Sequence, residues 1–437
     1  MKKIILSCTI IIFSFMNSSY CLGSGTKDKP PSGQKGEAPS VLTSTDNPKV
    51  PPGLNPTPSL QPNKTKINTS SYHHKKGTFS PAEDKIEVVF YNVENLFDTE
   101  HDKGKNDWEF LPNDYPGKKE ACEKIKSDYF KEKCLASDWT EEKLKLKIEK
   151  IAEMFLRERA HLPDILGLCE VENENVVEML AKALGYEKYI VTNGPDKRGI
   201  DVAILYHPSS KLKLIRRRQH VIEGNHFISM PTRNILEGIF EIDGKHHLAV
   251  YVNHWPSQRN PSQTRLVVAR RLKTLILNKL KYHPETRIVA MGDFNTISND
   301  FPRPIRGVLT EIVEPSVGGD SLLYDVHKMF LRMGPKSIKN LLPRGTYFYA
   351  KNMEWNQLDK FLVSSKLLNE EGLRAEIDSF RIYAPDFSTK IYKYDDPNFW
   401  TFGSSVSGVP QKYNFETTEK DELGYSDHFP IVLGLKF

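Results

Sequence analysis

The stretch RIVAMGDFN, residues 287–295, joins an apolar run to a polar turn. Ile288 to Met291 reads as a buried strand, and Asp293 and Asn295 follow it closely. Burying a carboxylate or an amide is costly unless the group is hydrogen-bonded or binds something. Residues two apart share a face at a strand end, so Asp293 and Asn295 should point the same way. The stretch therefore predicts a polar site at the end of a buried strand.

Four other polar segments end or follow apolar runs in the same manner. Each of them contributes a carboxylate, an amide or an imidazole, which are groups that carry chemistry when they gather in one place. The segments are YNVEN (residues 91–95), CEVEN (169–173), NHW (253–255) and SDHFP (426–430). Five such strand ends indicate one shared polar site.

In this order, the five segments resemble the endonuclease/exonuclease/phosphatase superfamily. Its members include pancreatic-type deoxyribonucleases, abasic-site endonucleases, sphingomyelinases and inositol-polyphosphate phosphatases. The resemblance covers about residues 82–437, and the ordered set is far more specific than any one motif. Within the superfamily, three longer stretches resemble secreted bacterial endonucleases: NVENLFD (92–98), RGIDVA (198–203) and NHWPS (253–257).

The resemblance implies an α/β (α+β) fold, a four-layered sandwich of two packed mixed β-sheets flanked by helices. The sequence pattern itself shows only that strands and helices interleave. A helix should start at Thr140 because acidic residues fill its first turn, and Gly185 should end another. The expected strands are 86–91, 165–169, 202–206, 238–242, 248–252, 287–291 and 360–363, and the other helices are 175–184 and about 263–280.

The N-terminal residues read as an export signal followed by a linker. Lys2 and Lys3 precede an apolar stretch that ends at Phe15, which is typical of a signal peptide over residues 1–23. A lipoprotein is disfavoured because Tyr20 fits poorly before Cys21. Residues 24–80 are rich in Pro, Ser, Thr and Lys and predict a disordered linker, so residues 81–437 form the catalytic domain.

The signal peptide predicts a secreted or periplasmic bacterial protein. No later run reaches the ~18 apolar residues of a membrane helix, so stable membrane insertion is not expected. An oxidising compartment permits Cys122 and Cys134 to pair. No obligate protein partner is evident.

The resemblance also implies a metal site. Glu170 matches the principal ligand of a Mg²⁺ ion, with Mn²⁺ or Ca²⁺ as alternatives, and Asp427 and Glu94 should lie near the same cation. Asn92 should support the metal or bind phosphate. Carboxylates of this kind suit a hard cation that keeps several waters and takes substrate phosphate as a further ligand.

Two histidines complete the implied catalytic set. His428 should be oriented by Asp359, since a carboxylate on one imidazole nitrogen fixes the tautomer and aims the other nitrogen at phosphate. His254 matches the histidine that faces the leaving group. Asp293 should orient or deprotonate the attacking water, and Asn295 should bind the phosphate or a histidine.

Two further residues are expected to contact the substrate. Arg198 could grip a phosphate. Asp201 could contact substrate or act as the carboxylate partner of His254, and the sequence leaves both alternatives open.

These groups predict a metal-dependent phosphodiesterase, most simply a non-specific nuclease for DNA, RNA or both. A formal charge of +5 suits a polyanionic substrate without identifying it. One alternative is a phospholipid or inositol-phosphate phosphodiesterase, disfavoured because Thr296 to Ser298 replaces the Asn-Tyr-Arg extension of phosphoinositide phosphatases. Asp395, Asp396 and Pro397 also interrupt the aromatic stretch that a membrane hairpin would need. The other alternative, a catalytically silent surface-binding relative, is disfavoured because no matched position is missing.

Overall fold

The computed structural model describes residues 77–80, 82–310, 321–369, 371–394 and 403–437. The expected signal peptide and most of the expected linker lie outside these ranges. Residues 77–80 were assigned to the linker, yet they contact the domain: Leu162 N donates to Thr78 O (2.8 Å), and Phe79 stacks on His207 at 3.7 Å between ring centroids. Ordered packing thus begins slightly before residue 81.

The first sheet has six strands around a parallel pair. β1 runs parallel to β2, with Phe90 opposite Gly167, and antiparallel to β16, with Phe90 opposite Ile431. The order across the sheet is β13 (Arg374–Ile382), β16 (Ile431–Lys436), β1 (Lys85–Leu96), β2 (Ile165–Val171), β4 (Asp201–Tyr206) and β3 (Lys188–Val191).

The second sheet also has six strands and one parallel pair. β7 runs parallel to β8, with His254 opposite Asp293, and β8 is antiparallel to β12, with Asp293 opposite Asp359. The order is β5 (Leu212–His220), β6 (Ile235–Ile242), β7 (His246–His254), β8 (Arg287–Asp293), β12 (Asp359–Val363) and β9 (Tyr324–Asp325).

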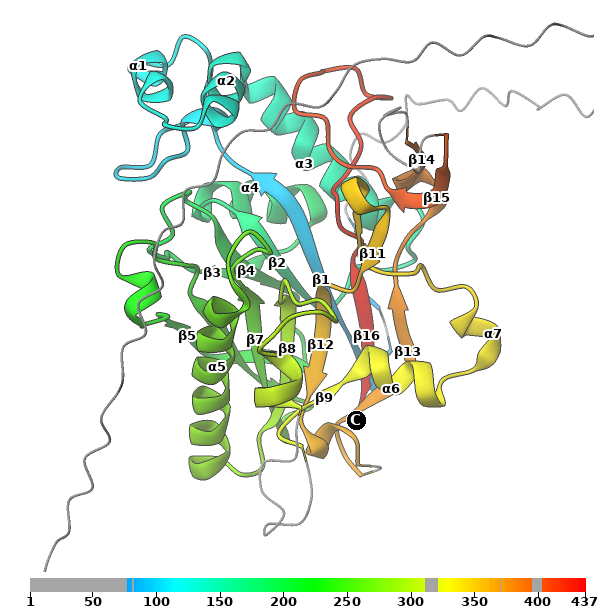
Figure 1. Ribbon diagram of the computed structural model, residues 1–437. Coiled ribbons are helices and arrows are strands. Elements are labelled where there is room, and N and C mark those ends of the chain that lie inside the picture. Colours follow the sequence, from blue (N-terminus) through cyan, green and yellow to red (C-terminus); the bar gives the residue numbers. More distant parts are fainter. Residues whose placement is uncertain (1–76, 81, 311–320, 370, 395–402) are drawn as a thin grey trace, which may run out of the picture. The chain divides into compact units, whose positions relative to one another are not determined.

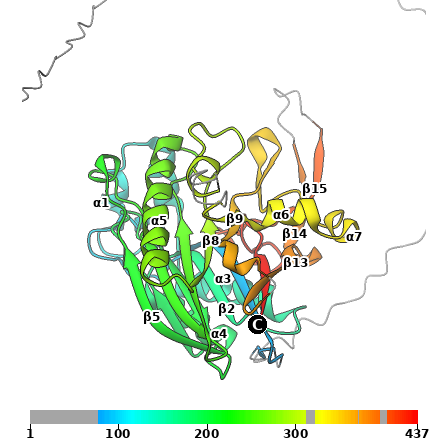
Figure 2. The same ribbon diagram turned by 90° about the horizontal axis from the view of Figure 1, so that it is seen from below.

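The two sheets pack face to face with helices outside, which confirms the expected four-layered sandwich (Figures 1 and 2). The alternation of β1 shows why. Val88 and Phe90 enter the core between the sheets, whereas Val89 and Tyr91 enter the core under the helices, because successive side chains point to opposite faces. The first sheet is covered by α3 (Glu141–Leu156) and α4 (Glu174–Leu184), and the second by α5 (Ser262–Tyr282).

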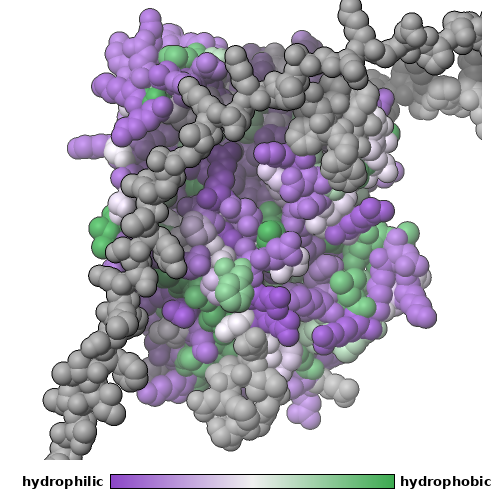
Figure 3. Space-filling view, in the orientation of Figure 1, coloured by the Kyte–Doolittle hydropathy of each residue, from purple (hydrophilic) through white to green (hydrophobic). Residues whose placement is uncertain are grey.

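The expected helix ends hold. The Thr140 side chain caps α3 by accepting from Lys143 N (3.4 Å), and Gly185 ends α4 in the left-handed conformation. Among the described residues, no helix combines the length and apolar character needed to cross a membrane. In Figure 3 most of the coloured surface is hydrophilic, and hydrophobic residues are scattered over it.

Shorter elements complete the domain. They are α1 (Lys118–Glu123), α2 (Asp128–Ala136), α6 (Val326–Met333), α7 (Lys336–Lys339), β10 (Tyr347–Tyr349), β11 (Glu354–Asn356), β14 (Thr389–Lys393), β15 (Ser405–Pro410), a π-turn at Ile305–Leu309, and 3₁₀ turns at Trp108–Phe110, Asn225–Phe227, Ala350–Asn352, Ser365–Leu367 and Asp386–Ser388. β14 and β15 form a two-stranded ladder. A hairpin was not expected from the sequence there, and residues 395–402 between the two strands lie outside the described ranges.

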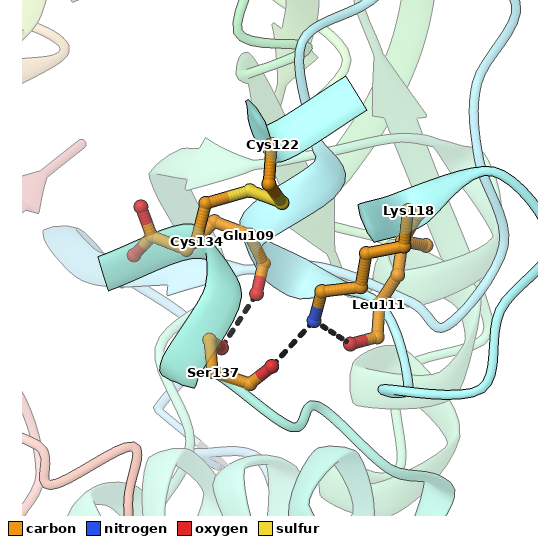
Figure 4. The surroundings of a disulfide bond; sticks show 6 residues. All are labelled: Glu109, Leu111, Lys118, Cys122, Cys134 and Ser137. Atoms are coloured by element: carbon orange, nitrogen blue, oxygen red, sulfur yellow. Dashed lines mark hydrogen bonds between the residues drawn. A yellow bond between two sulfur atoms is a disulfide. The ribbon is translucent and has the colours of Figure 1, made fainter. Parts of the chain in front are cut away.

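A disulfide joins Cys122 of α1 to Cys134 of α2 (Figure 4). Beside it, the buried Lys118 ammonium donates to the carbonyls of Leu111 (2.6 Å) and Ser137. The Ser137 hydroxyl donates to Glu109 O at 2.6 Å. The segment that contains α1 and α2 has few apolar residues of its own, so hydrophobic packing alone would hold it weakly. The disulfide and the hydrogen bonds of Lys118 stabilise it instead.

Glu237 of β6 ties α5 to the second sheet, which gives a pH-dependent prediction. Its carboxylate contacts His220 Nε2 (3.0 Å), Lys279 Nζ (2.9 Å) and Tyr251 Oη (3.0 Å). Burial opposes ionisation, but the bonds from His220 and Lys279 hold the pKa of Glu237 at about 2. Glu237→Gln should lower the free energy of unfolding at pH 7 by about 1–3 kcal/mol.

The sign of that effect follows from the depressed pKa. The contribution of the carboxylate is complete above its ordinary pKa of 4.5 and is lost as the pH falls toward about 2. Urea unfolding of the wild type and of Glu237→Gln measures the difference between their free energies of unfolding. That difference should fall by roughly half or more between pH 7 and pH 3. An equal difference at both pH values would contradict the ionised role of Glu237.

Candidate active site

Six strand ends from both sheets meet at one edge of the sandwich. The carboxyl ends of β1, β2, β7 and β8 lie there, together with the amino ends of the antiparallel strands β12 and β16 (Figure 1). The registers place His254, Asp293 and Asp359 side by side at this edge. All five motifs found in the sequence therefore end near one another.

Asn92 joins the carboxylates of the two sheets. Its amide Nδ2 donates to Glu170 Oε1 (3.4 Å) and to Asp293 Oδ2 (3.3 Å). Glu170 interrupts the regular pairing of β2 and has a positive φ of 62°, a conformation unusual for a residue with a Cβ. This turn leaves the Glu170 side chain 16% exposed at the strand end. Local backbone strain of this kind is common where a side chain is aimed for function.

The turn after β8 fixes Asp293. Asn295 donates to Asp293 from its backbone N (2.8 Å to Oδ1) and from its amide Nδ2 (3.0 Å to Oδ2). Asn295 lies beyond the end of β8 and has a positive φ of 48°, so a turn and not strand alternation brings its side chain onto the Asp293 carboxylate. Burial raises the pKa of Asp293 above its ordinary value, although the nearby His428 opposes the shift. A buried carboxylate held in this way can accept a proton near neutral pH.

His428 lies against Asp359. The ring Nδ1 is 2.7 Å from Asp359 Oδ2, and the ring is almost fully buried. Burial disfavours the charged ring, but the Asp359 carboxylate outweighs it and raises the pKa of His428 well above its ordinary value. Ser426 holds this loop to β1, since its hydroxyl donates to Asn92 O (2.7 Å) and accepts from His428 N (3.1 Å). The arrangement leaves Nε2 of His428 directed away from Asp359.

His254, at the end of β7, faces the carboxylates of Glu170 and Asp293. Its Nε2 is 3.6 Å from Glu170 Oε1 and 3.7 Å from Asp293 Oδ2. Its Nδ1 is buried and has no hydrogen-bond partner among the described residues. Burial lowers the pKa of His254 well below its ordinary value, and the charges of Arg233 and Arg198 add to this shift. The two histidines thus favour opposite protonation states in the free protein.

Asp201 does not pair with His254. Both of its carboxylate oxygens accept from Gly194 N at 3.0 Å, and Oδ1 also accepts from Thr192 Oγ1. Asp201 therefore holds the loop between β3 and β4, next to the exposed Arg198, whose Nη2 donates to Asn95 Oδ1 (2.8 Å). Of the two alternatives for Asp201, partnership with His254 is the one that the geometry does not support.

Glu94 is engaged by the chain that precedes β16. Its Oε2 accepts from Tyr413 N (3.0 Å) and Asp427 N (2.9 Å), and its Oε1 pairs with Lys412 Nζ (3.2 Å). These contacts indicate an anchor for the loop that carries Asp427 and His428. No group of three or more His, Cys, Asp or Glu side chains in the described ranges lies close enough together to stand out as a metal site. The placement of Glu170, Asp427 and Glu94 around one cation stays a prediction.

Some residues at the site were given no role from the sequence. Ser426 precedes Asp427 in a motif that had been found, so its position was the available signal. Tyr347 lies with its ring centroid 5.0 Å from that of His428, and it comes from the short strand β10, which has no sequence signature. Lys412 pairs with Glu94 over a large sequence separation and likewise had no local signal.

Comparison with known proteins identifies this arrangement. A family model described as "Endonuclease/Exonuclease/phosphatase family" matches residues 87–436, which include both histidines and all the carboxylates of the site. The chain belongs to this family. It is accordingly a phosphoesterase of the endonuclease/exonuclease/phosphatase type.

The chain is also similar to several solved structures of differently named proteins. Danio rerio TDP2 complexed with a single-strand DNA product is 14% identical, with 81% of this chain and 99% of that chain covered and a TM-score of 0.45. Bacteroides thetaiotaomicron mannosyl-6-phosphatase is 14% identical (80% and 100% covered, TM-score 0.44). The human nocturnin catalytic domain with bound sulfate is 15% identical (83% and 97% covered, TM-score 0.44). No curated protein matched the chain.

Proposed function

We propose that this phosphoesterase is an exported nuclease that hydrolyses phosphodiester bonds of DNA or RNA with the help of a divalent cation. The observation that carries the proposal is the pair of imidazoles, His254 and His428, on either side of the fixed carboxylate of Asp293. Hydrolysis of a phosphodiester needs three groups around phosphorus. They are a base that accepts a proton from water, a positive charge that stabilises the non-bridging oxygens, and an acid that donates a proton to the leaving oxygen.

Asp293 is suited to act on the attacking water. Asn295 and Asn92 fix its orientation, and its raised pKa makes it a better proton acceptor than an ordinary aspartate. One of its oxygens can accept the hydrogen bond of a water and take its proton as the bond to phosphorus forms. No covalent enzyme intermediate is required.

His428 is suited to stabilise the charge that grows on the phosphate. The Asp359 carboxylate holds Nδ1–H, keeps the ring charged and leaves Nε2–H to donate to a non-bridging oxygen. A positive group fixed at that position stabilises the transition state more than the ground state. His254 lies on the opposite side of Asp293 and is the group that would meet the leaving oxygen. An anionic phosphate beside its ring would favour the charged form, which can donate the proton.

The donor set at this edge fits a hard divalent cation. Glu170 and Asp427 present carboxylates that are 16% and 28% exposed, and Asn92 supplies an amide at the same place. Burial raises the pKa of Asp427, and the neighbouring charge of Glu170 adds to the shift, which indicates negative charge that a cation would offset. Such a cation, when bound, neutralises charge that develops on the phosphoryl oxygens. Glu170 and Asp427 would hold it, with water as further ligands.

Two features support export. The N-terminal sequence reads as a signal peptide, and the Cys122–Cys134 disulfide is a bond that persists in oxidising compartments. The stretches NVENLFD, RGIDVA and NHWPS support a place among secreted bacterial nucleases within the family.

Removal of divalent cations should abolish activity. Purified protein incubated with circular DNA, linear DNA or RNA should cut at least one of them in Mg²⁺ or Mn²⁺, and excess EDTA should stop the reaction because oxygen ligands alone cannot replace the cation charge. Added Mg²⁺ should restore cutting. Gel analysis reads the result, and circular DNA distinguishes internal from terminal cleavage.

Sphingomyelin and a sugar monophosphate serve as comparison substrates in the same assay. Turnover of either one with no cutting of nucleic acid would overturn the nuclease assignment within the family. Full nuclease activity in EDTA would overturn the role of the cation.

A further inference from the structure

β5 carries three adjacent arginines that neither the fold nor the proposed chemistry uses. Arg216, Arg217 and Arg218 are all exposed, and β5 is the edge strand of the second sheet. No acidic residue in the described ranges forms an ion pair with any of them, whereas the neighbouring His220 pairs with Glu237. Successive strand residues point to opposite faces, so Arg216 and Arg218 lie on one face of β5 and Arg217 on the other. Because β5 is an edge strand, a ligand that carries several negative charges can approach both faces.

The strand register places these arginines on the His254 side of the candidate site. Arg218 lies opposite Glu237, which lies opposite Tyr251, three residues before His254. Two strand spacings give about 10 Å across the sheet, and three residues give about 10 Å along it, so the backbones are on the order of 14 Å apart. A nucleic-acid strand advances about 3.4 Å per nucleotide in a duplex, so about four nucleotides cover this distance.

A pocket of about 510 Å³ lies beside Arg217 and Arg218. Arg217, Arg218 and Gln219 line one side of it, and Gln219 Oε1 accepts from Asn193 N (2.9 Å), which fixes this wall to the β3–β4 loop. The acidic residues that line it come from other parts of the chain: Asp102 from the loop after β1, Glu172 from the turn after β2, and Glu174 from the start of α4. A backbone of phosphates entering the pocket is repelled by these acidic residues and attracted to β5.

Arg198 places a positive charge near both the pocket and His254. The charges of Arg198 and Arg233 act on the His254 ring, and Gly199, next to Arg198, lines the pocket. Arg198 is exposed, whereas Arg233 is buried and paired with Asp196 (3.3 Å).

We propose that Arg216, Arg217 and Arg218 bind the phosphate backbone of a nucleic-acid strand whose scissile phosphate lies between His254 and His428. This inference rests on the proposed nuclease function and extends it, because it assigns a polymeric substrate that reaches several nucleotides beyond the cut. A sugar monophosphate or a lipid headgroup is too short to reach β5 from the site.

The test is the salt dependence of binding. A fluorescein-labelled 30-nucleotide DNA strand is titrated with full-length protein in EDTA, to prevent cutting, at several concentrations of NaCl. The R217A/R218A variant loses two phosphate contacts, so the slope of log K against log salt should be smaller by about 1.4 than for wild type. Affinity at low salt should fall about ten-fold or more. In Mg²⁺, kcat/KM should fall at least about ten-fold more for DNA than for bis(4-nitrophenyl) phosphate.

The R332A/K336A variant is the matched control, because it removes two exposed charges near α6 and α7, which both views place on the far side of the domain from β5 (Figures 1 and 2). Its slope should equal that of wild type. An R217A/R218A slope equal to wild type, in a wild-type protein that does cut nucleic acid, would overturn this inference and leave the arginines as charges that protect an edge strand. A wild-type protein that cuts no nucleic acid would overturn the proposed function as well.

Discussion

His428→Ala should lower turnover of a phosphodiester by about 10²–10⁴-fold, the contribution typical of a positioned acid or base. The ring is held by Asp359 at 2.7 Å and is the group best placed to keep a positive charge against the phosphate. Steady-state kinetics on a nucleic-acid substrate measure the loss, and thermal unfolding of the same sample checks that the domain remains folded. Near-normal turnover would show that the ring is only structural.

The Asp359→Asn variant tests whether the charge of Asp359 acts on His428 or whether the two residues are only close together. Asparagine keeps the size of the side chain but removes the charge that holds the His428 ring protonated, so turnover should fall in the same step. Residues that act as a unit are strongly non-additive, and the double variant should lose much less than the product of the two single losses. Strictly multiplicative losses would contradict the pairing of His428 with Asp359.

Gly292→Ala should have the largest effect on stability, about 3 kcal/mol or more in the free energy of unfolding, as for other changes at a strained backbone position. Gly292 has a φ of +155°, and a Cβ at this position would lie 2.2 Å from the backbone oxygen of Asn253. Backbone atoms cannot move aside as a side chain does, so β7 and β8 would have to separate next to His254 and Asp293. Urea denaturation measures the loss.

Gly307→Ala is the matched control. A Cβ at Gly307 meets no atom within 4 Å, and this glycine lies in the helical turn Ile305–Leu309. Alanine should leave stability unchanged or raise it by up to about 1 kcal/mol, because it restricts the unfolded chain. Equal losses at Gly292 and Gly307 would show that the close approach to Asn253 does not determine stability.

The sequence predicted those parts of the fold that local patterns encode. The apolar runs predicted β1 and β8, and Thr140 and Gly185 predicted helix ends, because caps and periodicity depend on neighbouring residues. β5 was not predicted, since an exposed edge strand rich in arginine has no apolar alternation on which a prediction could rest.

At the candidate site, the sequence predicted which residues lie there better than it predicted which residues they contact. The pairing of His428 with Asp359 was implied by the resemblance to the family, and the structure brings the two residues together. Glu94 was expected beside a metal, yet its partners Tyr413, Lys412 and Asp427 lie over 300 residues away in the chain. Contacts of that range are set by how the sheets and the loop before β16 pack, which no local pattern contains.

The position of β16 has a consequence for synthesis. β16 lies between β1 and β13 inside the first sheet, and His428 lies three residues before it. Asn92 and Glu170, by contrast, come from the first two strands to be made. A nascent chain therefore carries no complete active centre until its final strand has left the ribosome and inserted beside β1. In the exported nuclease proposed above, this order of synthesis would limit cutting inside the producing cell, because export could be under way before His428 is in place.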